Sequence, residues 1–163
     1  MASQTDAIVE RLLGRKPLPP LEPGSKVWDT ELARAIAGLD EHRFVIAALH
    51  LANDDIDACH RIAQASEGDP TADLLHATLH RREGDYWNSK YWYSHVEDKH
   101  ALARADAAAF VDACAAAAKG KSGGSKLQQR QWDELLELVR WTRENCARGD
   151  TGGADDEAEL DEY

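Results

Sequence analysis

Cysteine is scarce in this sequence, and its few cysteines stand far apart. Cys59, Cys114 and Cys146 are odd in number and form no CxxC pair. Disulfide frameworks and thiolate zinc sites need paired or closely spaced cysteines. The sequence therefore predicts neither kind of site, and we expect reduced, partly buried thiols.

Long apolar runs are also lacking. No stretch approaches the roughly 20 apolar residues of a membrane-spanning helix. The first 16 residues carry acids and contain no apolar core of the kind found in secretion signals. We therefore expect a cytoplasmic protein with no membrane anchor.

Clustered positive charge is a third absence. The formal net charge is −11, and residues 148–163 hold seven acids against one arginine, which is −6 and leaves −5 on the remainder. Binding to a phosphate backbone depends on clustered Lys and Arg, so we expect no nucleic-acid partner. Residues 149–163 have few apolar side chains and repel one another, which predicts a disordered acidic tail.

The common catalytic motifs are missing as well. The sequence has no GxSxG, no local cysteine-protease signature and no glycine-rich phosphate loop. The segment GKSGGSK at 120–126 lacks the glycine spacing of a phosphate loop and has no strand before it. We interpret this segment as a linker.

Helical patterns are what the sequence does contain, with no convincing alternation of β-branched residues. An all-α fold is therefore predicted, with a helix and a proline-rich arm in residues 1–27, a single all-α domain in 28–148 and the tail in 149–163. Capping residues, glycines and prolines set the expected boundaries. The expected helices cover about residues 5–14, 29–38, 41–52, 55–66, 70–83, 86–96 and 101–118, with a last amphipathic helix after residue 126.

A repeat is visible when residues 42–66 are laid over residues 72–96, an offset of 30. Identical residues fall at the landmarks of two helical hairpins, and each hairpin would bury its apolar face against the next. The identical pairs are Ala47 with Ala77, Leu49 with Leu79, His50 with His80, and Asp55 with Asp85.

The second copy resembles tetratricopeptide and Sel1-type repeats. Ala77, the GDY turn at 84–86, Ser89 and Tyr93 match the small, turn and aromatic positions of such repeats. The resemblance covers about 55 residues and implies hairpins stacked in a tetratricopeptide-like arrangement with flanking helices. Histidines 76 and 80 stand where those repeats prefer Leu and an aromatic, and the period of 30 is shorter than their usual 34.

A narrower resemblance rests on HRREGDYWNSKYW at residues 80–92. It is similar to a signature of small helical proteins of fungi and some bacteria whose function is uncharacterised. This resemblance implies no activity, and no catalytic residue follows from it.

A divalent metal site is the first functional hypothesis. His76 and His80 are four residues apart and share one helix face, a spacing that helical metal sites use. Stacked hairpins would place His50 in the position equivalent to His80. Asp54, Asp57 or Asp85 would add a carboxylate ligand or hold one of the histidines. The alternative is a chance HxxxH pair whose rings only fill the core. His60 aligns with Lys90 and is expected to lie outside the site.

A ligand pocket at the hairpin junction is the second hypothesis. His50 or His80 would act as general base. The alternative for the arginines is a solvated or ion-paired helix end that complements the helix dipole. The residues expected to orient a polar or anionic small molecule are Arg81, Tyr86, Asn88, Lys90 and Tyr91.

The sequence therefore predicts a helical protein that binds a small ligand or a metal, and an enzyme acting on a polar or anionic small molecule is one form of this hypothesis. Its cofactor is unknown, with a divalent metal as the candidate. The alternative is a non-catalytic tetratricopeptide-like module whose groove binds a partner peptide. The position of the histidines distinguishes the two, because a ligand site needs them together in an enclosed place.

Overall fold

The computed structural model describes residues 2–120 and 124–147, and these residues form helices and loops without any strand. The predicted all-α class is confirmed. No described helix combines the length and apolar character needed to cross a membrane. The helices are α1 (Gln4–Leu13), α2 (Thr30–Ala37), α3 (Arg43–Ala52), α4 (Ile56–Ala65), α5 (Pro70–Glu83), α6 (Tyr86–Val96), α7 (Ala107–Ala118) and α8 (Gly124–Asn145).

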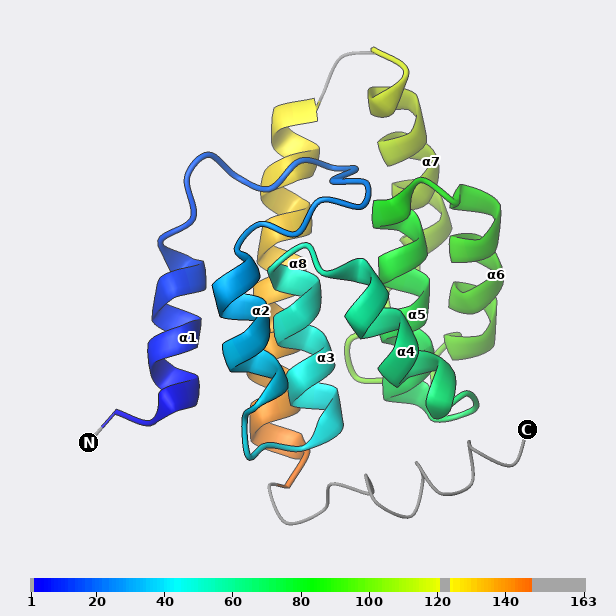
Figure 1. Ribbon diagram of the computed structural model, residues 1–163. Helices are drawn as coiled ribbons and strands as arrows, with labels where there is room; N and C mark the ends of the chain where they lie inside the picture. Colours follow the sequence, from blue (N-terminus) through cyan, green and yellow to red (C-terminus); the bar gives the residue numbers. More distant parts are fainter. Residues whose placement is uncertain (1, 121–123, 148–163) are drawn as a thin grey trace.

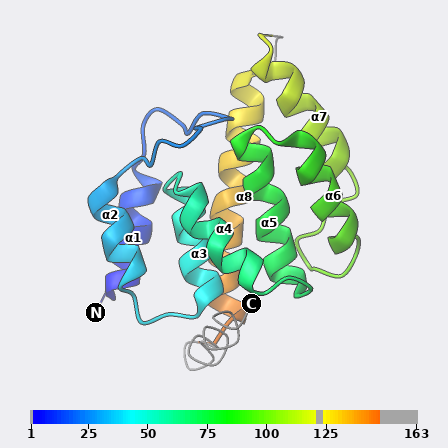
Figure 2. The ribbon, with the colours of Figure 1, turned by 45° about the vertical axis from the view of Figure 1, so that its right-hand side comes forward.

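Helices α3 to α6 form a row in which each packs against its neighbour in the chain. Figures 1 and 2 show this row, with α8 running behind it and α1 and α2 at one end. Helix α8 contacts α3 and α7, and α7 contacts α6. The long amphipathic helix predicted at the end of the sequence therefore supports the row from behind.

The core lies between the row and α8. Leu49, Leu75 and Leu79 from the row are fully buried, as are Leu135 and Leu138 of α8 within 2 % exposure. Burying such a side chain stabilises the fold by about 1.5–3 kcal/mol. These leucines belong to one hydrophobic core that joins the row to α8.

Small residues are buried in both hairpins. Ala47 and Ala77 are both fully buried. The Ser89 hydroxyl of α6 donates to the backbone carbonyl of Ala77 on α5 at 2.7 Å. The second hairpin therefore closes on a small residue and a side-chain hydrogen bond.

The two hairpin turns have matching backbone geometry. Asp55 N–H donates to His50 O at 2.9 Å, and Asp85 N–H donates to His80 O at 2.9 Å. Asp55 caps α4 and Asp85 caps α6 through their carboxylates. The residue before each cap has a positive φ, 61° in the first turn and 86° at Gly84 in the second. The aligned landmarks therefore share a local structure as well as a sequence.

The predicted start of the alanine-rich helix is wrong by six residues. This helix, α7, begins at Ala107 and not at Ala101. His100 explains the difference: its Nδ1 accepts from Leu102 N–H at 3.0 Å, and its Nε2 lies 3.1 Å from the Thr71 hydroxyl. Side-chain hydrogen bonds of this kind compete with helix formation.

The proline-rich arm connects α1 to α2 and crosses the upper part of the molecule in Figure 1. It contains no helix between residues 15 and 28. The Pro20 carbonyl accepts from Arg82 and from Gln131, each at 3.2 Å. The arm is thus attached to the folded helices. The acidic tail predicted for residues 149–163 lies outside the described residues.

Candidate metal centre

Three histidines meet between α4 and α5. His60 comes from α4, and His76 and His80 come from successive turns of α5. One ring nitrogen from each lies within 4.8 Å of the others. The ring centroids are 4.8 Å apart for His60 and His76, 5.3 Å for His60 and His80, and 4.7 Å for His76 and His80.

His76 is the innermost of the three. It is 3 % exposed, and its ring stacks on Trp92 of α6 with centroids 4.1 Å apart and planes 15° apart. Burial, with the nearby His80 and His60, lowers the pKa of His76 to about 4. The imidazole is therefore neutral near pH 7, which is the form that binds a metal.

Glu83 sets the orientation of His80. The two residues stand three apart on α5, and Nδ1 of His80 is hydrogen-bonded to Oε1 of Glu83. A carboxylate can only accept, so Nδ1 donates and Nε2 keeps its lone pair. Histidines that bind metals are commonly held by such a carboxylate on the other ring nitrogen.

Two ring nitrogens of the cluster are buried without a partner. Nδ1 of His76 and Nε2 of His80 contact no hydrogen-bonding group in the described part of the chain. A buried polar atom left unpaired costs about 1–3 kcal/mol. Nε2 of His80 has a lone pair, and Nδ1 of His76 has one when the proton of that ring is on Nε2. A metal ion would satisfy both lone pairs.

Three imidazoles suit zinc, copper, iron or nickel. Zinc–nitrogen bonds of about 2.0–2.1 Å place tetrahedral ligands about 3.3 Å apart. The three ligand atoms lie within 4.8 Å of one another, which is compatible with this spacing. The donor set therefore fits such an ion.

A second group of donors adjoins the first on its outer side. His80, Glu83 and Asp85 also offer ligand atoms within 4.8 Å of one another, but both carboxylates are exposed. Asp85 accepts from the Asn88 backbone at 3.2 Å and from its side-chain amide at 3.3 Å. Asp85 thus serves as a helix cap, and Glu83 serves to hold His80.

A surface pocket of about 590 Å³ opens beside the cluster. Two of the three histidines face it, together with the tip of the arm and the first turn of α4. The lining residues are Gly24, Ser25, Ile56, Asp57, His60, His80 and Glu83.

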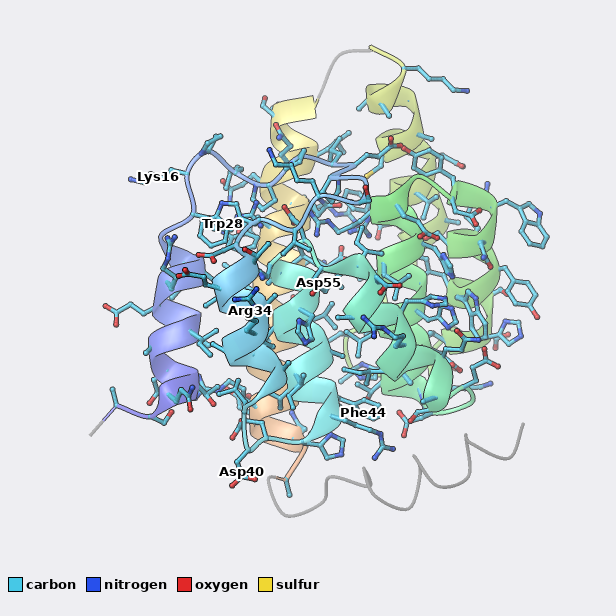
Figure 3. All side chains as sticks on the ribbon, viewed as in Figure 1. Lys16, Trp28, Arg34, Asp40, Phe44 and Asp55 are labelled. Carbon is cyan, nitrogen blue, oxygen red and sulfur yellow. The ribbon has the colours of Figure 1, made fainter. Side chains whose placement is uncertain are left out.

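His50 does not join the cluster, although the sequence placed it there as a ligand and general base. Its Nδ1 lies 3.6 Å from Asp55 Oδ2, and its ring lines a pocket shared with Arg34 of α2. Figure 3 shows the labelled Asp55 and Arg34 on this part of the molecule. Burial lowers the pKa of His50.

Asp54 is also separate from the histidines. It is 4 % exposed, and its two carboxylate oxygens accept from Arg15 and from Arg82, both at 2.8 Å. The guanidinium of Arg15 further stacks on Trp28 at 4.5 Å. Asp54 is therefore the anion of a buried ion cluster, with both oxygens already bound.

Arg81 is buried as well, and its partners are internal. It is 1 % exposed and donates to Tyr93 and Glu134 at 3.0 Å and to Gln131 at 3.3 Å. Arg81 therefore fits the ion-paired alternative and not the solvated one.

The other predicted ligand residues spread over α6. Lys90 pairs with Asp112 at 2.9 Å on the surface, and Asn88 contacts the cap of its own helix. Tyr91 is 44 % exposed, and the Tyr86 hydroxyl is buried. Neither these residues nor Arg81 line the pocket beside the histidines. These five predicted ligand residues therefore share no pocket with His80.

His60 was missed, because the repeat alignment matched it to Lys90 and placed it outside the site. A different signal identifies it. Helices α4 and α5 are antiparallel neighbours joined by a turn at Gly68, and residues equally far from such a turn lie opposite each other. His60 is eight residues before Gly68 (68 − 60) and His76 eight after it (76 − 68).

Comparison of the chain with models of protein families, with curated proteins and with solved structures finds no match. A function can therefore be inferred only from the geometry of the histidine cluster and the pocket beside it.

Proposed function

We propose that this protein binds a divalent transition-metal ion through His60, His76 and His80. Glu83 holds His80 in the tautomer that leaves Nε2 free for the ion. The observation that carries the proposal is the pair of buried, unpartnered nitrogens, Nδ1 of His76 and Nε2 of His80, within a three-histidine group.

A purely structural role accounts less well for the same geometry. Histidines that only fill a core are expected to hydrogen-bond through their ring nitrogens, since buried polar groups are nearly always paired. The stacking of His76 on Trp92 explains where that ring lies. It leaves the two unpartnered nitrogens unexplained, and a bound ion accounts for both.

A small-molecule ligand would occupy the adjacent pocket, within reach of the ion. The volume of this pocket, about 590 Å³, lies in the range of about 300–1,000 Å³ found for small-molecule sites. In this proposal the stacked, tetratricopeptide-like hairpins act as the frame that brings α4 and α5 together.

The test uses untagged full-length protein, stripped with a chelator and titrated with zinc in a calorimeter. We expect one ion per chain, and a gain in unfolding free energy of about 2.7 kcal/mol when free zinc is 100 times Kd. His76→Gln should weaken binding at least tenfold.

The control is His95→Gln, which changes an exposed histidine on α6. It should bind zinc as the wild type does. Absence of zinc binding, or equal affinities for His76→Gln and the wild type, would refute the proposal.

A second candidate function is the non-catalytic interaction module. What favours it is the exposed aromatic ridge of Trp87 and Tyr91, which are 74 % and 44 % exposed and stack with centroids 5.7 Å apart. Exposed aromatic side chains are enriched at protein interfaces. A correctly folded protein that takes up no metal in the titration would favour this candidate.

A further inference from the structure

The ion site proposed above has an inner and an outer side. His76 lies on the inner side, against Trp92, and does not line the pocket. His60 and His80 line both the pocket and the histidine cluster. An ion held by all three rings is thus covered on the side of His76 and faces the pocket on the other.

The described residues supply no fourth ligand. No group in residues 2–120 and 124–147 joins another His, Cys, Asp or Glu to the three histidines. The two carboxylates that line the pocket have other partners: Glu83 is hydrogen-bonded to His80, and Asp57 pairs with Arg61 at 2.9 Å.

We propose that the metal keeps an open coordination position directed at this pocket, which takes water or a small monodentate anion. This inference rests on the proposed function. Structural zinc sites are closed by four protein ligands, whereas catalytic sites have three and leave the fourth position to water or substrate. The three-histidine set therefore makes this a site of the catalytic kind, in which the bound water would be activated.

The arm also lines this pocket. Gly24 and Ser25 belong to its lining, together with His60 and His80. Ser25 is exposed and contributes no donor to the metal group, so its replacement can block access and leave the three rings in place.

The experiment loads the full-length protein with cobalt(II), whose visible spectrum reports coordination, and titrates azide as the probe. The wild type should bind one cobalt ion and change its spectrum when azide enters the open position. Ser25→Trp should bind cobalt with the same affinity and show at least a tenfold weaker response to azide. The matched control is Ser125→Trp, which places the same side chain on an exposed turn of α8 and should respond like the wild type.

The outcomes separate the two proposals. Failure to bind cobalt would refute the metal site itself, and the open position with it. Cobalt binding with a spectrum that azide leaves unchanged would refute the open position alone. An unchanged azide response in Ser25→Trp would refute the pocket as the route of access.

Discussion

The two hairpin turns share their backbone geometry but differ in chemistry. Both have a capping aspartate whose N–H binds a histidine carbonyl at 2.9 Å, and both have a left-handed residue before the cap. In the first turn that residue is Asp54, which neutralises part of a buried arginine pair. In the second turn it is Gly84, and His80 meets two more histidines.

The neighbours of each turn cause the difference. At the offset of 30, the place of His76 is taken by Ile46 in the first hairpin. His50 therefore has no histidine one helical turn before it, and its charged neighbour is Asp55 at 3.6 Å. Two turns with the same backbone geometry need not carry the same site, because a site needs partners from adjacent helices.

The largest effect is expected at the first turn. Asp54→Asn removes the only carboxylate that pairs with buried Arg15 and Arg82 among the described contacts. Breaking a buried ion pair by removing one partner costs about 3–5 kcal/mol, because a buried charge is left uncompensated. Chemical denaturation should show this loss.

Asp57→Asn is its control, since the Asp57–Arg61 pair is exposed. An exposed pair contributes about 0–1 kcal/mol. Equal stability losses for the two variants would show that the buried ion pairs of Asp54 stabilise the fold no more than the exposed Asp57–Arg61 pair does.

The second prediction concerns the carboxylate of the second turn. Glu83→Gln removes the charged acceptor from Nδ1 of His80 while keeping the shape of the side chain. Loss of such a partner typically lowers metal affinity about 10–100-fold. Zinc titration should show this decrease with little change in melting temperature.

Asp85→Asn provides the comparison for Glu83→Gln, because Asp85 contacts the backbone of α6. It should affect zinc affinity less than Glu83→Gln does. A larger loss of zinc affinity in Asp85→Asn than in Glu83→Gln would show that Glu83 is not the carboxylate that orients His80.

The smallest effect is expected for Gly84→Ala, which tests the left-handed residue itself. At φ 86° a side chain costs about 1–2 kcal/mol. A Cβ there would also lie 3.1 Å from a carboxylate oxygen of Glu22. Thermal unfolding should show a loss of this size.

Gly24→Ala separates the two causes of that loss. Gly24 has a φ of 70°, but a Cβ at this position would meet nothing within 4 Å. It should therefore cost less than Gly84→Ala. Equal costs would mean that the contact with Glu22 contributes nothing.

Much of the fold could be predicted from local signals. Asp29, Asp55, Asp69 and Asp85 each cap a helix, and these caps with the nearby glycines and Pro70 give the helix boundaries. The exception is the start of α7, where the ring of His100 binds a backbone N–H that a helix would otherwise use. Ring hydrogen bonds of this kind have no sequence signature.

Only the part of the site that lies on one helix could be predicted from the sequence. His76 and His80 are local neighbours on one helix, so their spacing found them. His60 and His50 depend on which helix faces α5, and the contacts show that α4 packs against it more extensively than α3. The repeat offset selects equivalent residues, whereas a metal needs adjacent ones, and adjacency follows from the turn at Gly68.

The most direct test of this account compares zinc affinity in His60→Gln and His50→Gln, two buried or half-buried histidines on neighbouring helices. Isothermal titration of both untagged proteins, with folding checked by circular dichroism, gives the result. We expect at least a tenfold loss of zinc affinity in His60→Gln and wild-type affinity in His50→Gln. A loss in His50→Gln with none in His60→Gln would contradict it.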